Sequence, residues 1–415
     1  MSTKRRLVCA LLLICLSVGH AHGQGGPTVE VFNDSRSEQA GAGSPLLQRL
    51  PVRVAVTTNA GFDTSVSTGA FSESRSSSFA QSGISLNYAF GTSRTRANLT
   101  ANTSIIYYPE LDSFQPDVDL RLAVKHQASR RLSLSAQILT RYGSQPIFRL
   151  SGNPDLDTND SNQRGGNFLD SRSSLSASYQ WLPRFSTVNS YSLRLRRYDE
   201  EAVAASRNRV EHRFGQQLRY LLLPVTTIVG EYRLALASYE DSSRDSTTNV
   251  LLGGIEQTFS SRLTGSFRAG VQFRSADGDG SDQTRPYFSS NVNYVLGENT
   301  EINWTSRYSI QESDSSDVTG PTSRTSFRTG LGLRHAITPR ISASLSAYYS
   351  SNAGGSNTPN GNGSSSRDLL VFSLSASYAV NRHLSANVGY THIEGASDGV
   401  ASSRNRYTAG VNFAF

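Results

Sequence analysis

The last ten residues, Arg406 to Phe415, read Arg-Tyr-Thr-Ala-Gly-Val-Asn-Phe-Ala-Phe, and they decide the fold class of this chain. Tyr407, Val411, Phe413 and Phe415 have polar or small residues between them and share one face of an alternating pattern. This two-residue period is typical of a β-strand with one apolar side. The same alternation recurs back to residue 51 in segments of about ten residues, which predicts about 18 strands. The last four strands are expected at 341–350, 369–380, 384–393 and 406–415.

The charged residues of the predicted strands share one face. The face with the aromatic and aliphatic residues carries no Arg, Lys, Asp or Glu in any predicted strand core. Only 37% of the chain is hydrophobic, which is too little for the large buried core of a soluble protein of this length. On a lipid-facing surface, an arginine at mid-bilayer would cost roughly 2–4 kcal/mol. We therefore predict that the apolar face meets lipid, that the charged face lines a lumen, and that the sheet is closed, because an open edge in lipid leaves backbone groups unpaired.

The connections between these strands alternate in length. Short ones include 91–93, 297–299 and 338–340, whereas 143–168 and 394–405 are long and polar. Short periplasmic turns and longer outside loops are typical of outer-membrane barrels. The sequence thus predicts an all-β fold, a transmembrane antiparallel up-and-down β-barrel of about 18 strands.

The chain is expected to have three regions. Residues 1–23 have the features of a secretory signal peptide, with basic residues before the apolar run Leu7–Val18. That run is shorter than the roughly 20 residues of a spanning helix, and it contains both cysteines of the chain. Residues 24–50 are rich in Gly, Ser and Gln and are expected to form a mobile periplasmic arm. Residues 51–415 are expected to form the barrel.

The net charge of the chain is +7 and comes almost wholly from arginine. A basic chain suggests nucleic acid as a partner, but export and the lack of a basic run longer than two residues after the signal peptide argue against it. Disorder is excluded by the 18 Tyr and 18 Phe residues. Outer-membrane lipid is the partner that the pattern predicts.

Several short motifs resemble known outer-membrane barrels. Tyr407, Val411, Phe413 and Phe415 are similar to the C-terminal signal that the barrel-assembly machinery reads in Gram-negative bacteria. Ala60-Gly61-Phe62-Asp63-Thr64 and the stretch 378–384 resemble the "putative β-barrel porin 2" group, although Thr64-Ser65 stands where that group usually has Asn. The resemblance implies a location in the outer membrane of a Gram-negative bacterium. It also implies polysaccharide-export components as partners, since the group includes barrels found with exopolysaccharide export systems.

Arginine is densest on the predicted lumen face between residues 187 and 239. One interpretation is an anion-favouring or sugar-binding wall, because rings of arginine bias a pore toward anions. The other is a ladder of Arg–Glu pairs that satisfies the wall and contributes little energy. The candidate pore-lining residues are Arg194, Arg196, Arg209, Glu211, Arg213, Arg219, Glu231 and Arg233.

The longest connection, 143–168, is the third outside loop. In general porins this loop folds inward and narrows the channel, so the resemblance implies a constriction in which Asp155, Asp157 and Asp160 face the arginines. An ordinary solvated loop is the alternative. The acidic runs 155–160 and 277–282 have oxygen-bearing side chains at every second position, as calcium-binding loops do. They lack the bidentate Glu of an EF-hand, so no metal site is expected.

The function expected from these features is a pore for passive or weakly selective diffusion of small hydrophilic solutes, without a cofactor. The main alternative is a barrel accessory to exopolysaccharide export or surface assembly. An outer-membrane hydrolase is a lesser option, because His383 and Ser385 are close in sequence but no acid is evident to orient the histidine.

Overall fold

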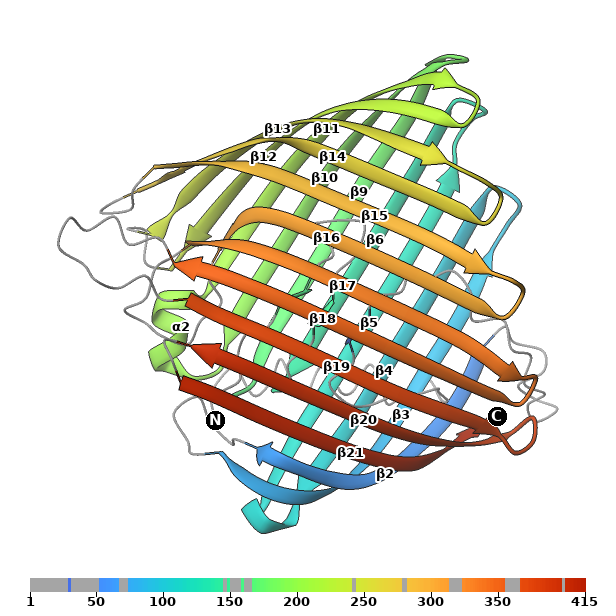
Figure 1. The fold of residues 1–415 in the computed structure, drawn as a ribbon, viewed down its shortest axis with the longest axis vertical. Helices are drawn as coiled ribbons and strands as arrows, with labels where there is room; N and C mark the ends of the chain where they lie inside the picture. Colours follow the sequence, from blue (N-terminus) through green and yellow to red (C-terminus); the bar gives the residue numbers. More distant parts are fainter. Residues whose placement is uncertain are drawn as a thin grey trace.

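The computed structural model describes residues 29–30, 52–66, 74–144, 148–149, 158–159, 166–240, 244–277, 282–312, 323–354, 366–397 and 400–415. Eighteen strands in these ranges form one closed antiparallel barrel (Figure 1), which confirms the predicted fold class. They are β2 (Val52–Val66), β3 (Arg75–Gly91), β4 (Thr95–Tyr108), β5 (Ser113–Gln127), β6 (Leu132–Gly143), β9 (Phe168–Leu182), β10 (Phe185–Tyr198), β11 (Arg209–Leu223), β12 (Thr226–Tyr239), β13 (Ser246–Thr258), β14 (Leu263–Ala276), β15 (Gln283–Leu296), β16 (Thr300–Glu312), β17 (Ser323–Thr338), β18 (Ile341–Gly354), β19 (Ser366–Ala379), β20 (Leu384–Ser397) and β21 (Val400–Ala414).

The barrel closes between its first and last strands. β2 pairs antiparallel with β21, and the register places Val56 opposite Phe413 and Asp63 opposite Arg406. The other edge of β2 pairs with β3. Both edges of β2 therefore have backbone partners, as a sheet in lipid requires.

The two faces of the barrel wall differ as the sequence predicts. On β21, the side chains of Tyr407 and Phe413 are exposed on the outside, whereas Arg406 is 2% exposed. The same contrast holds on β16, where Trp304 is exposed and Arg307 is buried. Apolar side chains thus face the membrane and guanidinium groups face the interior, the inverse of a soluble β-protein.

One end of the barrel carries short connections, such as 183–184 and 339–340, and is called the turn end here. The opposite end, which carries 199–208 and 240–245, is called the loop end. At the loop end the strands are longer than the sequence predicts. The expected outside loop 394–405 is wrong, because β20 continues to Ser397 and β21 begins at Val400.

Two connections at the loop end contain helices. The 3-10 helix η1 (Pro109–Leu111) joins β4 to β5, and the α-helix α2 (Glu201–Arg207) joins β10 to β11. The alanine-rich sequence of α2 favours a helix, and its Val203 packs with Phe168 and Tyr198 of the neighbouring strands. No helix in the described part of the chain is long and apolar enough to cross a bilayer.

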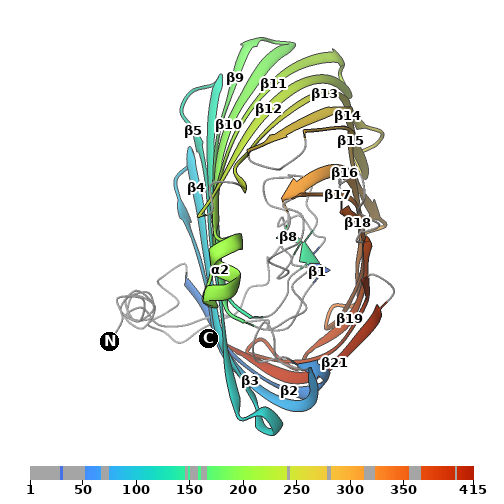
Figure 2. The same cartoon turned by 90° about the vertical axis from the view of Figure 1, so that its left-hand side faces the viewer.

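A small sheet of two-residue strands lies within the ring of barrel strands (Figure 2). β1 (Val29–Glu30) pairs parallel with β7 (Phe148–Arg149), which pairs antiparallel with β8 (Thr158–Asn159). β1 lies against β18 and β19. The predicted signal peptide, 1–23, lies outside the described residues. So does the rest of the predicted arm, 24–50, which stays a prediction.

Candidate functional site: an arginine-lined cavity

Neighbouring strands place the arginines of the site on the inner face of the wall. The register sets Arg194 of β10 opposite Arg172 of β9 on one side and opposite Glu211 of β11 on the other. Because directly opposed side chains lie about 5 Å apart, these groups must interact across the strands. Arg172 and Arg194 would repel each other, so an acid has to lie between them.

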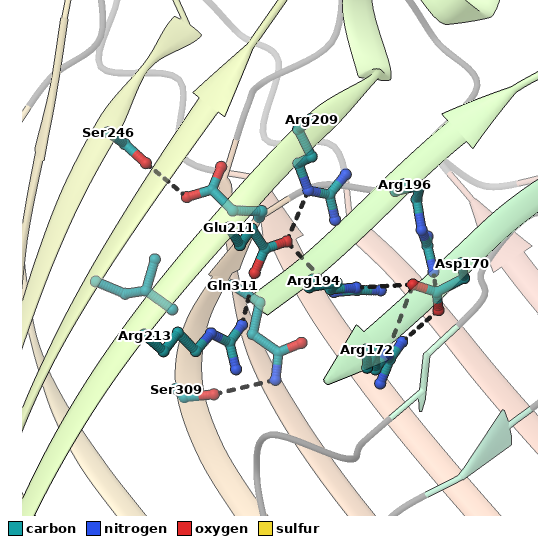
Figure 3. A network of polar contacts seen from close by, with 12 residues as sticks. Asp170, Arg172, Arg194, Arg196, Arg209, Glu211, Arg213, Ser246, Ser309 and Gln311 are labelled. Atoms are coloured by element: carbon teal, nitrogen blue, oxygen red, sulfur yellow. Dashed lines mark hydrogen bonds and ion pairs between the residues drawn. The ribbon is translucent and has the colours of Figure 1, made fainter. Parts of the chain in front are cut away.

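Asp170 is that acid (Figure 3). Its carboxylate forms ion pairs with Arg172 at 2.6 Å, Arg196 at 3.0 Å and Arg194 at 3.1 Å. The side chain of Asp170 is 6% exposed, so these charges interact in a medium that screens them less than bulk water. Three guanidinium groups are thereby held around one carboxylate.

Glu211 forms the centre of a second cluster on the same wall (Figure 3). It pairs with Arg209 at 2.7 Å, Arg213 at 2.8 Å and Arg194 at 3.4 Å. Arg194 belongs to both clusters and joins β9, β10 and β11 into one network. Because each arginine is tied to a fixed acid, the positive groups are positioned before any solute arrives.

The network continues on β12 to β14. Arg268 of β14 lies 3.1 Å from Glu231 and 2.7 Å from Glu256, and so connects two acids. Arg233 pairs with Glu231, and Arg219 pairs with Glu256. Positive side chains therefore line the inner wall on β9, β10, β11, β12 and β14.

A cavity of about 390 Å³ lies against this wall. Nine arginines and three glutamates line it, together with serine side chains. The lining therefore has a positive excess of six charges. Asp170 and Glu256 are not part of the lining but pair with arginines that are, and counting them reduces the excess to four. The charged lining residues are Arg172, Arg194, Glu211, Arg213, Arg219, Glu231, Arg233, Arg268, Arg274, Arg307, Glu312 and Arg328.

Six of the eight candidate pore-lining residues line this cavity: Arg194, Glu211, Arg213, Arg219, Glu231 and Arg233. The other two, Arg196 and Arg209, are each 1% exposed and lie outside the lining. Arg196 lies over the ring of Phe168 and Arg209 over the ring of Tyr239, both near the loop end. That the six conduct a solute stays a prediction.

Three acids of the site, Asp170, Glu256 and Glu312, were not among the candidates. Asp170 stands near the start of β9, and Glu312 is the last residue of β16. Asp170 and Arg172 are two residues apart on one strand, so their side chains point to the same face. This spacing would have placed Asp170 on the lumen face. At Glu312, the alternation has already given way to a polar loop.

Other candidate residues are placed as follows. Asp155, Asp157 and Asp160 lie outside the described residues, so the constriction stays a prediction. Between Asp277 and Asp282, the four intervening residues also lie outside them. His383 has its Nδ1 atom 3.0 Å from the backbone oxygen of Ala414 in a turn-end connection.

The residues that resemble an assembly signal all face outward at the turn-end half of β21. Tyr407, Val411, Phe413 and Phe415 are between 39% and 51% exposed. The rings of Phe413 and Phe415 lie 5.2 Å apart, beside the seam with β2. Their recognition by the assembly machinery stays a prediction.

The family model described as "Putative beta-barrel porin 2" matches residues 51–415, the whole of the barrel. No curated protein matches the sequence. Among solved structures, the outer membrane protein opdK from Pseudomonas aeruginosa is 12% identical with a TM-score of 0.44, over 88% of this chain and 98% of that chain. OccAB4 from Acinetobacter baumannii is 11% identical with a TM-score of 0.43, over 90% and 100%. The siderophore receptor PirA from Pseudomonas aeruginosa is 10% identical with a TM-score of 0.40, over 87% and 80%.

Proposed function

This chain belongs to the family described as "Putative beta-barrel porin 2", a family of the Gram-negative outer membrane, and from that premise we propose that it is a weakly anion-selective diffusion pore. Small hydrophilic solutes would cross the lumen down their own gradients. Anionic solutes would be favoured over cationic ones of the same size.

The observation that carries this proposal is the charge of the cavity. Nine arginines against three glutamates give the lining a positive excess. A confined space with charge of one sign raises the local concentration of counter-ions, and rings of arginine favour anions in pores. The ion pairs fix the guanidinium groups in place without neutralising the lining as a whole.

Single-channel recording in planar bilayers under a KCl gradient tests the proposal. The reversal potential of the full chain should have the sign of chloride preference. The double variant Arg213→Gln/Arg219→Gln removes two charges from the cavity lining and should move that potential toward zero, because fewer cations remain to attract chloride.

Arg197→Gln is the matched control. Arg197 lies near the loop end of β10, is 40% exposed and pairs with Glu240 outside the cavity lining. Its loss should leave the reversal potential unchanged. Absence of conductance in the recordings, or a reversal potential that shows a preference for potassium, would contradict the proposal.

One observation favours the second candidate, a barrel accessory to exopolysaccharide export. The sheet of β1, β7 and β8 lies inside the ring and occupies part of the lumen (Figure 2). If this sheet narrows an open channel, deletion of 146–163 should raise conductance. A conductance that is negligible before and after the deletion would favour the accessory role.

The family is described as one of porins, and no described contact favours a hydrolase. Loss of an activity against lipids or peptides on Ser385→Ala would be the evidence for that option.

A further inference from the structure

The hydrogen-bond ladder between β15 and β16 is incomplete at the loop end. It runs from the turn end up to Phe288, which lies opposite Tyr308. Beyond this pair, β15 continues to Gln283 alongside β14, and β16 continues to Glu312 alongside β17. Among the described residues, no ladder pair joins the two strands over these last positions. Figure 2 shows the end of β16 turned into the ring, so the wall is split here.

Side chains of β12 and β14, on the same stretch of wall, hold the end of β16 in this position. The amide of Gln272 on β14 donates to the backbone oxygen of Ile310 and accepts from its N–H, both at 3.0 Å. Glu312 accepts hydrogen bonds from Arg274 at 3.0 Å and from the hydroxyl of Tyr239 at 2.6 Å. The backbone N–H and C=O of Ile310 thus bond to the side chain of Gln272 on β14 and not to the neighbouring strand β15.

Outward-facing apolar residues of β14 lie beside the split. On the far side of β15, Thr284 is opposite Phe273 and Pro286 is opposite Val271. Phe273 and Val271 face outward and are 48% and 38% exposed, so apolar outer surface continues up to β15 on this side. Proline has no N–H to offer a neighbouring strand and is found at strand edges, as it is here. Within the described residues, the β15–β16 ladder therefore stops beside apolar outer surface.

The arginine-lined cavity reaches this split. Its lining includes Tyr287 of β15, one residue beyond the last ladder pair, and Ile310 of β16, two residues beyond it. Tyr287 packs with Val250, and the guanidinium of Arg233 lies 5.5 Å from its ring centre. Arg274 lines the same part of the cavity. Buried apolar side chains and positive charge therefore lie side by side at the split, since Tyr287 and Ile310 are 4% and 5% exposed.

We propose that the split between β15 and β16 is a lateral portal for a single-chain anionic amphiphile. The anionic head group would bind the arginines of the cavity, and the aliphatic chain would lie along Tyr287 and Ile310 and leave between the strands into the membrane leaflet at the loop end. This chemistry matches charge to charge and apolar surface to apolar surface. The portal rests on the cavity of the proposed function but does not require that the cavity conducts ions.

Photolabelling of the full chain in lipid vesicles tests the portal. The probe is dodecanoate with a photoreactive diazirine at the end of its chain, and labelled peptides are identified by mass spectrometry. Label should concentrate on residues 283–288 and 308–312. The matched control is dodecylammonium with the same diazirine, which the arginines should exclude from the split. Label spread evenly over the outward faces, or equal labelling of the split by both probes, would overturn the proposal.

A disulfide across the split gives a second test. Pro286→Cys/Ile310→Cys joins the positions that would pair if the ladder continued two residues beyond Phe288 and Tyr308. Its oxidation should abolish dodecanoate labelling of residues 283–288 and 308–312, and reduction should restore it. The control pair Ser290→Cys/Ser306→Cys joins existing ladder partners on the turn side of the split and should leave labelling unchanged. If the first disulfide does not form, the photolabelling of the wild-type chain by the two probes decides whether the portal exists.

The two proposals fail in different ways. Loss of anion preference with labelling intact would overturn the diffusion pore and leave the portal. Anion-selective conductance without labelling of the split would overturn the portal and leave the diffusion pore. Crosslinks between Pro286→Cys residues of two copies would show that the free edge of β15 is a contact between molecules, which would also overturn the portal.

Discussion

Asp63 of β2 and Arg404 of β21 form a bidentate ion pair across the seam where the barrel closes. The Nη2 and Nε atoms of Arg404 lie 2.6 Å and 2.9 Å from the two carboxylate oxygens, and the side chain of Asp63 is fully buried. Beside this pair, the guanidinium of Arg406 lies 4.1 Å from the ring centre of Phe79. The hydroxyl oxygen of Thr64 accepts the N–H of Asn405 at 2.8 Å. The Asp-Thr part of the motif at 60–64 thus holds the first strand to the last.

Replacement of this carboxylate should weaken the barrel. Asp63→Ala leaves buried guanidinium charge without its carboxylate, and breaking a buried pair in this way costs about 3–5 kcal/mol. The temperature at which the folded band disappears on a detergent gel should fall. The exposed pair of Arg197 and Glu240 is the matched control, because loss of an exposed pair costs about 0–1 kcal/mol, so Glu240→Ala should leave that temperature nearly unchanged. Equal shifts for both variants would contradict the role of the seam.

Gly61 is required by close approach at the same seam. A Cβ atom there would lie 1.9 Å from the backbone oxygen of Tyr407 and 2.6 Å from the ring of Phe79. Gly61→Ala should therefore lower the yield of folded, heat-modifiable barrel. Gly230→Ala is the control, because a Cβ atom at Gly230 meets nothing within 4 Å. Normal folding of Gly61→Ala would show that the seam tolerates a shift of the backbone.

Glu211→Gln should separate stability from selectivity. The variant keeps a hydrogen-bonding side chain but removes the negative charge that holds Arg194, Arg209 and Arg213 together. The three guanidinium groups then repel one another, so thermal stability should fall. The cavity also gains one net positive charge, so chloride preference in bilayer recordings should rise. A fall in both quantities would count against the cavity as the selective region.

Glu110 gives a pH dependence at the loop end. The hydroxyls of Ser77 and Ser78 donate hydrogen bonds to its carboxylate and lower its pKa from 4.5 to about 2. A carboxyl with a lowered pKa stabilises the folded state above its ordinary pKa, and this contribution is lost as the pH falls from about 4.5 toward 2. Carbon NMR titration should therefore show Glu110 ionised at pH 3.5, and Ser77→Ala/Ser78→Ala should raise its pKa toward 4.5. Ser104→Ala, whose hydroxyl contacts Gln81, should leave the titration unchanged.

The sequence predicts the wall of this barrel well and its loop end poorly, for a physical reason. Where one face meets lipid and the other water, as at Val411 and Phe413, the alternation is strict and gives both the strand and its orientation. Above the membrane both faces meet water, so the pattern fades. Residues 402–405 are all polar, and the start of β21 was therefore predicted at 406 instead of 400. Helix α2 is a single short segment in a stretch that reads as a loop.

The site was predictable to a similar extent. The alternation of side chains along each strand puts Arg194, Glu211 and Arg213 on the inner face of the wall. The structure finds them there in one cluster. The contact of Gln272 with Ile310 could not be predicted, because it joins strands that are not adjacent in the sheet. Pro286 gives a local sign that the described part of the β15–β16 ladder ends there.

The pairing of β2 with β21 has a consequence for the order of assembly. Asp63 cannot meet Arg404 until nearly the entire polypeptide has been delivered to the membrane, because 341 positions separate them. Until then β2 presents an unsatisfied edge that any other extended segment could occupy. Another segment would lack the partners that β21 offers to Asp63 and Gly61, so it would pair less stably with β2. A defect in either contact should therefore first appear as slow or incorrect barrel closure during biogenesis, before it affects the finished barrel.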